Sequence, residues 1–382
     1  MQRWNPQLFR KHASGVEPEL LAHLVKVGRR ITQAHRDVQP VFTLRHLAAL
    51  SEVDYGFLRQ TVARRTEAYA EFRIKKRVAE QLPTQYRTIC APSPSLMKVQ
   101  RWITQNILAH VPAHNCSVAF SKGDSLYKAV EPHCQAKWLV KVDVQSFFES
   151  ISESTVYRLF DNLGFEPLIA FEMARLCTRD QHDAQQNEGQ RKDYNLASLY
   201  VIEQYTRSVQ GHLPQGAPTS PMLANLVCRG LDERLAAIAE ERGLNYTRYA
   251  DDITFSSLDP NFGRDMAKVL IQLVYRELSR QRLRPNTAKT TVVPPSARKI
   301  VLGLSVEEKT PRLARHFKDL LRQHIHYLTH PEVGPIKHAT ARKFASVVGL
   351  RNYVGGLLAH AAQIEPTWAE KQRERFLEVD WP

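Results

Sequence analysis

Three aspartates stand where their side chains could hold metal ions. Asp143 lies near the end of the apolar run KWLVKVDV, and Asp251 with Asp252 forms an acidic pair inside RYADDITF. Divalent cations such as Mg²⁺ prefer carboxylate oxygens. Two such cations, roughly 3.5–4 Å apart, can activate an attacking hydroxyl and neutralise a leaving pyrophosphate. If the two segments lie side by side, this trio predicts a two-metal site for nucleotidyl transfer.

An ordinary polar turn is the alternative for the acidic pair, because Asp is common in turns. The residues on both sides of Asp251 and Asp252 are apolar or aromatic and are typical of buried strands. Two adjacent carboxylates between such strands repel each other unless a cation compensates their charge. The flanking pattern therefore favours a cation site over a simple turn.

The charge of the whole chain indicates a polyanionic partner. Its 382 residues are long enough for two or three subdomains, and 43% apolar content is ordinary for a folded protein. The formal net charge is +14, with the basic excess heaviest in the first hundred residues. A surface kept soluble by positive charge is the simpler explanation, but an excess of this size favours nucleic acid. No long apolar run or basic amphipathic anchor indicates a membrane partner.

Cysteine usage indicates a reducing compartment. The five cysteines are scattered and form no C-x-x-C pair, which predicts a cytoplasmic protein without a disulfide framework. His110, His114 and Cys116 lack a fourth ligand at a zinc-like spacing, so we interpret them as core or surface residues. The first residues contain no apolar segment typical of a signal peptide.

The elements around the aspartates can be read from apolar spacing. Residues 17–70 have the three- and four-residue steps of helices, with Thr43 as a candidate N-cap. The segment TLRHLAALSEVDYGFLRQTV resembles a helix-turn-helix but lacks glycine in the turn, so a packed helical leader is favoured over a sequence-reading module. Alternation in residues 72–92 predicts a basic β-hairpin. A helix from LMKVQRWITQNILAHV follows it.

The central strands and the tail complete this outline. The run KWLVKVDV predicts a strand inside a sheet, because it is apolar nearly throughout. NYTRYADDITFSS predicts two strands with the carboxylates at their turn, and KIVLGLSV predicts one more strand. Residues 178–195 are almost free of apolar side chains and predict an exposed loop. The tail from Pro311 onward predicts helices with a basic face and an apolar face.

Three motifs, in this order along the chain, resemble those of reverse transcriptases. VKVDVQSFF at 140–148 is similar to the first carboxylate motif, LPQGAPTSPMLANL at 213–226 to the nucleotide-binding turn and helix, and YADD at 249–252 to the catalytic hairpin. Around them, IKKR with YRTICAP is similar to the fingers hairpin, NTAKT to the lysine motif and VLGLSV to the primer grip. The resemblance covers about residues 70–310.

The resemblance implies a set of metal ligands. Asp143 and Asp251 bind two Mg²⁺ ions directly, with Mn²⁺ as a possible substitute, and Asp252 completes the acidic site. The backbone carbonyl of Val144 is a further ligand. These roles agree with the preference of hard cations for oxygen donors.

It also implies contacts to the incoming nucleotide. Phe148 matches a steric gate whose ring excludes a 2′-hydroxyl and so selects deoxynucleotides, while Phe147 is assigned to the core. Gln215 and Gly216 lie against the nucleotide, where glycine permits a close backbone approach because it has no Cβ.

Cationic side chains would hold the triphosphate. Lys76 and Arg87, on the expected fingers hairpin, are candidates to clamp it, with Lys75 and Arg77 as neighbouring alternatives. Lys289 matches the lysine that protonates the departing pyrophosphate, and an ordinary exposed lysine is the alternative there.

The implied fold is an α+β right-hand polymerase. Residues 1–70 would form an N-terminal helical extension, residues 71–310 the fingers and an antiparallel palm, and residues 311–382 a helical thumb. The stretch after the primer grip is too short for an RNase H domain or intron-type appendices, which favours retron reverse transcriptases. The retron signature N-A-x-x-H is reduced here to its histidine, His133, and V-T-G reads Val-Leu-Gly at 301–303.

The retron resemblance implies partners and a biological role. The enzyme would use deoxynucleoside triphosphates to copy its own structured non-coding RNA into a branched RNA–DNA hybrid (msDNA), primed from an RNA 2′-hydroxyl. It would act in anti-phage defence with an effector protein encoded nearby. Another defence-associated reverse transcriptase of the abortive-infection type, or a non-catalytic RNA-binding scaffold, remains an alternative.

Overall fold

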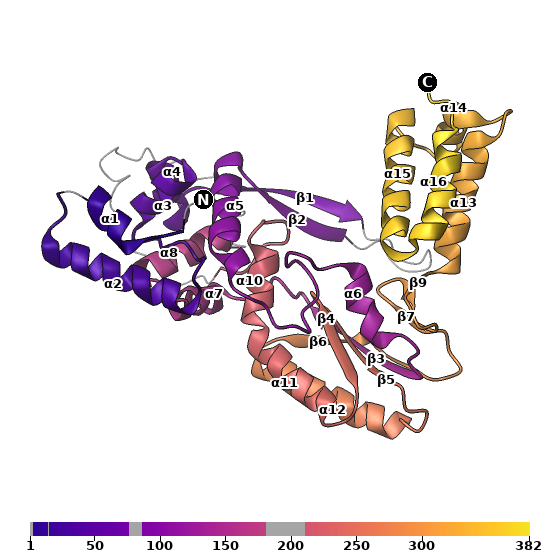
Figure 1. Ribbon diagram of the computed structural model, residues 1–382, viewed down its shortest axis with the longest axis horizontal. Coiled ribbons are helices and arrows are strands. Elements are labelled where there is room, and N and C mark those ends of the chain that lie inside the picture. Colours follow the sequence, from indigo (N-terminus) through magenta and orange to yellow (C-terminus); the bar gives the residue numbers. More distant parts are fainter. Residues whose placement is uncertain (1–2, 14, 76–85, 181–210) are drawn as a thin grey trace. The chain divides into compact units, whose positions relative to one another are not determined.

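The computed structural model describes residues 3–13, 15–75, 86–180 and 211–382 (Figure 1). Its helices and antiparallel strands give an α+β fold, as predicted. The chain divides into two compact units, and it passes between them several times. Unit 1 consists of Met1–Gly123, Asp143–Leu235 and Val274–Asn286, and unit 2 of Asp124–Val142, Ala236–Leu273 and Thr287–Pro382.

Unit 1 contains the N-terminal helices and a two-stranded hairpin. The hairpin pairs β1 (Tyr69–Lys75) with β2 (Tyr86–Pro92) in antiparallel register, which confirms the predicted strands. Among the described residues, the helices that lie wholly in this unit are α1 (Pro6–His12), α2 (Pro18–Ala34), α3 (Leu44–Ser51), α4 (Tyr55–Val62), α5 (Pro94–Asn106), η1 (Leu108–His110), α7 (Glu153–Asn162), α8 (Pro167–Cys177) and α10 (Ser220–Val227).

The helical leader is packed, as predicted. The Thr43 side chain accepts a hydrogen bond of 3.1 Å from the backbone N–H of His46 and so caps α3. Glu52 takes the left-handed conformation in the turn to α4, where glycine would be favoured. Helix α4 then packs against α8 and buries Leu58 and Val62. This burial leaves the α3–α4 pair without a free recognition helix.

Unit 2 contains most of a four-stranded sheet (Figure 1). The strand order is β4 (Asn245–Tyr249), β5 (Asp252–Ser257), β3 (Trp138–Gln145) and β6 (Arg284–Val293). Strand β3 lies between β5 and β6, and its Leu139, Val140 and Val142 are buried, which confirms the predicted interior strand. Two helices, α11 (Arg229–Glu240) and α12 (Arg264–Arg280), each pass from one unit to the other.

A buried histidine joins a short helical segment to this sheet. His133 ends η2 (Glu131–His133), which follows α6 (Leu126–Val130). Its Nδ1 lies 2.8 Å from the Ser256 hydroxyl and its Nε2 lies 2.7 Å from the Thr247 hydroxyl. The side chain is fully buried, and this burial lowers the pKa of His133 to about 4 with a smaller contribution from the Lys141 charge. The histidine retained from the retron signature is thus a link inside unit 2.

The segment KIVLGLSV forms two strands, so the prediction of one strand was wrong. Strand β7 (Ile300–Val301) pairs with β8 (Leu304–Ser305), and β8 pairs with β9 (Arg312–Leu313). Leu302 and Gly303 have φ of 47° and 84°, the successive positive values of a primed hairpin turn. Leucine rarely adopts this conformation, so the sequence did not indicate a turn between β7 and β8.

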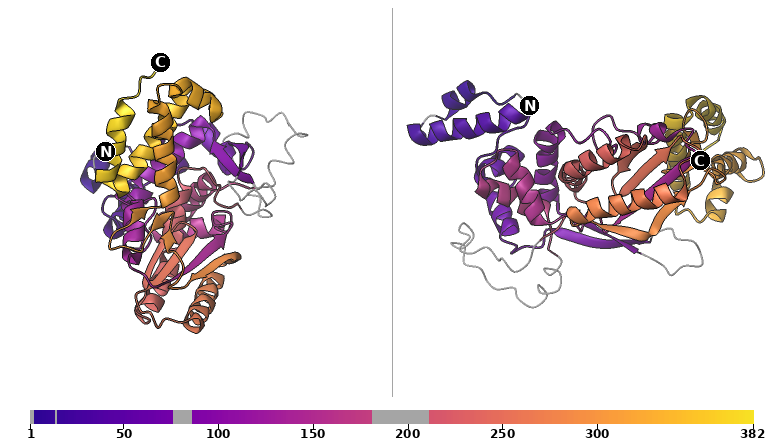
Figure 2. Two further views of the ribbon diagram at one scale, coloured as in Figure 1. Left: turned by 90° about the vertical axis from the view of Figure 1, so that its right-hand side faces the viewer. Right: turned by 90° about the horizontal axis from the view of Figure 1, so that it is seen from below.

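The C-terminal residues form a helical bundle in unit 2. Its helices are α13 (Arg315–Thr329), α14 (Gly334–Ala341), α15 (Val347–Ile364) and α16 (Pro366–Leu377), drawn in yellow tones in Figure 2. Leu321 and Ile325 of α13 are buried with Leu350 and Val354 of α15, and the exposed face of α13 is basic, as predicted. None of the described helices is long and apolar enough to cross a bilayer, and all five cysteines are free thiols.

The His133 link predicts a pH-dependent stability. The pKa of His133 lies below its usual value, so acid protonates the unfolded chain before the folded one. The contribution of His133 is complete above pH 6.5 and decreases as the pH falls towards 4. Between pH 7 and pH 5 we expect a loss of about 2 kcal/mol, estimated at 1.36 kcal/mol per pKa unit.

Urea denaturation of the native chain and of His133→Gln at both pH values measures this contribution. The variant is less stable at pH 7 but loses about 2 kcal/mol less on acidification. An equal loss in both proteins would show that His133 is not the titrating group.

Candidate active site

The acidic pair lies at the tip of a tight hairpin in unit 2. Tyr249 pairs with Asp252, so Ala250 and Asp251 alone form the turn. Ala250 has φ of 55°, the left-handed conformation that two-residue hairpin turns require and that alanine rarely adopts. Asp251 is half-buried and Asp252 is exposed. The turn therefore presents two neighbouring carboxylates at the end of otherwise buried strands.

A buried arginine stabilises this turn through a hydrogen bond to its backbone. Arg248 is the largest fully buried side chain of the described structure, and its Nη1 donates to the Ala250 carbonyl at 3.1 Å. A hydrogen bond from a charged group is worth roughly 1.5–3 kcal/mol, enough to offset the strain of one left-handed residue. Sequence analysis missed Arg248, although an arginine inside an apolar strand is a signal that could have found it.

Strand β3 brings a second charged group towards the acidic pair. The backbone N–H of Lys137 donates to the Ser257 carbonyl at 2.8 Å, which joins the residue before β3 to the last residue of β5. These adjacent strands must therefore run in opposite directions, and the start of β5 lies beside the far part of β3. Burial lowers the pKa of Lys141, and the negative charge of Asp252 opposes this shift. Lys141 also donates to the Ile300 carbonyl at 2.9 Å.

The residues that follow along β3 belong to unit 1. Asp143 is buried, with 9% of its surface exposed, and Val144 is buried beside it in the sequence. Phe147 is also buried, which agrees with its predicted core role, whereas Phe148 is only partly buried. The ring centroids of the two phenylalanines are 5.5 Å apart.

The turn before α10 is held against the fingers hairpin inside unit 1. The backbone N–H of Cys90, in β2, donates to the Gln215 carbonyl at 2.7 Å. Gly216 has φ of 118°, and a Cβ there would lie 2.9 Å from the Cys90 carbonyl oxygen and from Cγ2 of Ile89. Gly216 is therefore required by the packing of β2, a constraint that sequence analysis had not included.

The segment after α8 is partly buried, so the prediction of an exposed loop over 178–195 was wrong at its start. Thr178, Arg179 and Asp180 are buried, and residues 181–195 lie outside the described part. Arg179 pairs with Glu67 at 3.2 Å and also with Glu71 of β1. Polar residues here find partners more than a hundred residues away, and composition cannot reveal such partners.

A second buried network lies next to this segment. Glu153 of α7 binds Arg64 at 2.7 Å and Arg175 at 3.0 Å, and the Arg64 Nη1 donates to the Thr178 carbonyl at 2.6 Å. The backbone N–H of Glu153 donates to the Gly211 carbonyl at 2.7 Å. Gly211 precedes Gln215 by only four residues, so this network holds the chain close to that turn.

The remaining candidates are cationic side chains. Arg87 is exposed on β2, Lys289 is exposed on β6, and Lys76 lies outside the described residues. Within the described ranges, no three His, Cys, Asp or Glu side chains gather closely enough to hold a metal ion by themselves.

Comparison with known proteins identifies relatives for most of the chain. The profile of the family described as "Reverse transcriptase (RNA-dependent DNA polymerase)" matches residues 74–329. The retron Ec86 reverse transcriptase of Escherichia coli is 29% identical, with 71% of this chain and 73% of that protein covered. The retron Mx162 reverse transcriptase of Myxococcus xanthus is 34% identical, with 62% of this chain and 48% of that protein covered. The retron Mx65 reverse transcriptase of the same organism is 28% identical, with 93% of this chain and 74% of that protein covered.

A telomerase from Candida albicans, solved in complex with a telomeric RNA fragment, is a structural neighbour. Its sequence is 12% identical and its TM-score is 0.39, with 81% of this chain and 56% of that chain covered.

The contact between Gly216 and β2 predicts a large stability effect. Gly216→Ala adds a Cβ against backbone at a positive φ, so we expect a loss of roughly 3 kcal/mol or more in the free energy of unfolding. Gly123→Ala is the matched control, because Gly123 also has positive φ, at 88°, but nothing lies within 4 Å of its Cβ position.

We expect the control to lose only about 1 kcal/mol. Urea denaturation measures both variants. Equal losses would mean that the backbone conformation alone, and not the approach of β2, requires glycine at 216.

Proposed function

Since the chain belongs to the reverse transcriptase (RNA-dependent DNA polymerase) family and is of the bacterial retron type, we propose that it is the polymerase of a retron. It is an RNA-directed DNA polymerase with a right-hand polymerase fold. In this proposal it copies its own structured RNA into a branched RNA–DNA hybrid and acts in anti-phage defence with an effector protein encoded nearby. The acidic hairpin beside β3 is the observation that carries the proposed chemistry.

Strand pairing within unit 2 brings the last residues of β3 in that unit beside the acidic pair. Lys137 and Ser257 are hydrogen-bonded partners on antiparallel strands, so five further steps along each strand bring Val142 opposite Asp252. The next residues are Asp143 on β3 and Asp251 in the turn. The proposed joint binding of a cation by Asp143 and Asp251 rests on the resemblance of their two motifs to the carboxylate motifs of the family.

The donors fit Mg²⁺, with Mn²⁺ as a substitute. All three are carboxylates, and the carbonyl of Val144 would add a neutral oxygen. Bound ions would activate the primer hydroxyl and compensate the charge of the leaving pyrophosphate. Lys141 supplies positive charge near Asp252 and so reduces the repulsion within the acidic pair.

Other side chains would position the deoxynucleoside triphosphate. The partly buried ring of Phe148 would exclude a 2′-hydroxyl, while buried Phe147 supports it from the core. Gln215 is fixed at its backbone by β2 and remains only partly buried, so its side chain can contact the nucleotide. Arg87, on that same strand, would bind the triphosphate, and Lys289 would protonate the pyrophosphate.

Unit 2 offers a basic surface for structured RNA. A cavity between β7–β9 and α13 is lined by five cationic residues, which are Arg298, Arg312, Arg315, Lys318 and Arg322. Glu307 and Glu308 also line it. The Lys318 ammonium and the Arg322 guanidinium lie 5.4 and 5.7 Å from the ring centre of Trp368. Cations and an aromatic ring together favour RNA, whose phosphates and bases they can both contact.

Substitution of the turn aspartate tests the metal assignment. Asp251→Asn removes a charged ligand at nearly constant size, so we expect DNA synthesis on an RNA template to be abolished. RNA affinity should remain nearly unchanged, because cations elsewhere bind the phosphates. Primer extension with Mg²⁺ or Mn²⁺, together with a filter-binding assay, measures both quantities.

The control is Asp265→Asn, which changes an exposed aspartate in the first turn of α12. This variant should polymerise normally. Full-length DNA from the Asp251→Asn protein would refute the metal assignment. Sequencing the copurified nucleic acid tests the retron proposal separately: DNA of fixed sequence joined to a discrete RNA supports it, and random DNA attached to protein refutes it.

The sugar gate generates a narrower prediction. Phe148→Ala opens space under the sugar, so we expect ribonucleotide incorporation to rise about tenfold or more relative to deoxynucleotides, the range of a single steric contact. Competition between labelled ribo- and deoxynucleotides measures the ratio. Phe160→Leu, a change in a buried ring of α7, serves as control and should leave the ratio unchanged; unaltered discrimination in Phe148→Ala would remove the gate assignment alone.

A further inference from the structure

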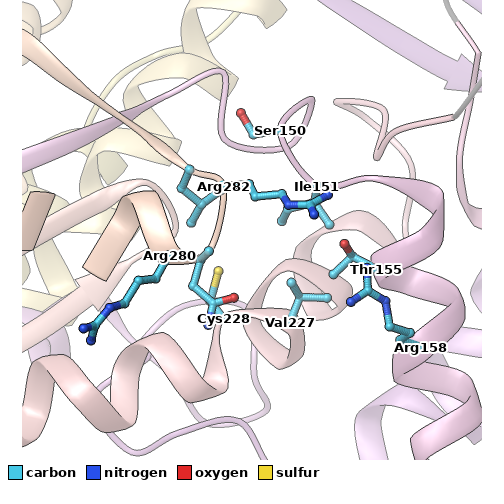
Figure 3. Close-up of a pocket in the computed structure, with 10 residues that line it drawn as sticks. Ser150, Ile151, Thr155, Arg158, Val227, Cys228, Arg280 and Arg282 are labelled. Carbon is cyan, nitrogen blue, oxygen red and sulfur yellow. The ribbon is translucent and has the colours of Figure 1, made fainter. Parts of the chain in front are cut away.

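A basic pocket in unit 1 takes no part in the chemistry described so far (Figure 3). Its cavity of about 260 Å³ lies between the start of α7, the end of α10 and the turn that links α12 to β6. Three of its ten lining residues are arginines and none is acidic. In a chain with 39 acidic residues, a pocket lined by arginine without a carboxylate is suited to an anion.

Arg282 occupies a backbone position that glycine would normally take. Its φ is 58°, and its backbone N–H donates to the Ser279 carbonyl at 3.0 Å, just past the end of α12. A left-handed residue directly after a helix is most often glycine, since other residues pay a steric cost there. The Arg282 side chain is exposed and makes no hydrogen bond or ion pair with any residue in the described ranges. A costly backbone position and a side chain without a partner among the described residues together point to a function for this arginine.

A second guanidinium faces the same space. Arg158 donates only its Nε, to the Ser154 carbonyl at 3.3 Å, so its terminal nitrogens have no acceptor among the described residues. Figure 3 shows the guanidinium groups of Arg158 and Arg282 on the side of the pocket where Thr155 lies. Arg280 extends in the opposite direction, and Glu277 holds it at 2.8 and 3.0 Å. Two arginines are therefore available to a ligand.

We propose that this pocket binds a phosphate group of the RNA backbone. Guanidinium groups match phosphate in charge and in planar hydrogen-bond geometry. The cavity is smaller than the roughly 300–1,000 Å³ of pockets for drug-sized ligands, so it suits one backbone phosphate better than a whole nucleotide. The inference rests on the proposed function only in taking RNA as the partner, and it adds an RNA contact outside the acidic hairpin and the basic surface of unit 2.

Arg282→Gly tests the proposal without unfolding the chain. Glycine suits the left-handed position, so the melting temperature should not fall. The affinity for a fluorescein-labelled RNA hairpin with a single-stranded tail should decrease. A plot of the logarithm of the binding constant against that of salt concentration should become less steep by roughly 0.7–0.9, the value for one lost phosphate contact.

Two control variants test whether the change in salt slope is specific to the loss of charge at position 282. Arg282→Lys keeps the charge and should retain the native salt slope. Arg276→Ala removes an exposed arginine of α12 that does not line the pocket, and it should also leave the slope unchanged. An unchanged slope in Arg282→Gly would overturn the proposal.

A second arm distinguishes backbone phosphate from a free anion. Calorimetric titration with pyrophosphate should show no difference between the native chain and Arg282→Gly. Loss of pyrophosphate binding in the variant with an unchanged RNA slope would assign the pocket to a free anion and refute the RNA contact. All binding is measured in the Asp251→Asn background as well, so the outcome does not depend on whether the chain synthesises DNA.

Discussion

The register of the β4–β5 hairpin is the constraint on which the acidic site depends. Pairing of Tyr249 with Asp252 leaves only two residues for the turn. A slip by one residue would send every side chain of β5 to the opposite face of the sheet, the carboxylate of Asp252 included. Buried Arg248 stabilises the turn of this hairpin, because its guanidinium donates a hydrogen bond to the Ala250 carbonyl. The buried guanidinium of Arg248 thus helps to position the carboxylates of Asp251 and Asp252.

Buried charge also organises unit 1. Glu153 is held by two arginines, Arg64 from the segment after α4 and Arg175 from α8. Removing one partner of a buried ion pair typically costs about 3–5 kcal/mol, because the other charge is left without compensation. The same glutamate binds the Gly211 backbone, so the helical leader and the approach to Gln215 share one network. The leader is therefore part of the support for the turn that contains Gln215 and Gly216.

Local patterns predicted much of the fold, and distant pairings explain what they missed. The apolar run of β3, the alternation of β1 and β2 and the Thr43 cap are properties of neighbouring residues, and the structure confirms them. Burial of Thr178 and Arg179 depends on partners far away in the sequence. The turn at Leu302 requires a conformation that leucine seldom adopts. The three aspartates were found from their motifs, and their joint binding of metal stays a prediction.

The close approach of β2 to Gly216 has an evolutionary consequence. Because a methyl group at position 216 would meet both the Cys90 backbone and the Ile89 side chain, the residue tolerated at 216 depends on the position of β2 and on the side chain at 89. A lineage that acquired a bulkier residue at 216 would need a compensating retreat of β2. Positions 89 and 216 should therefore covary among descendants of a common ancestor, even though they are more than a hundred residues apart in the sequence.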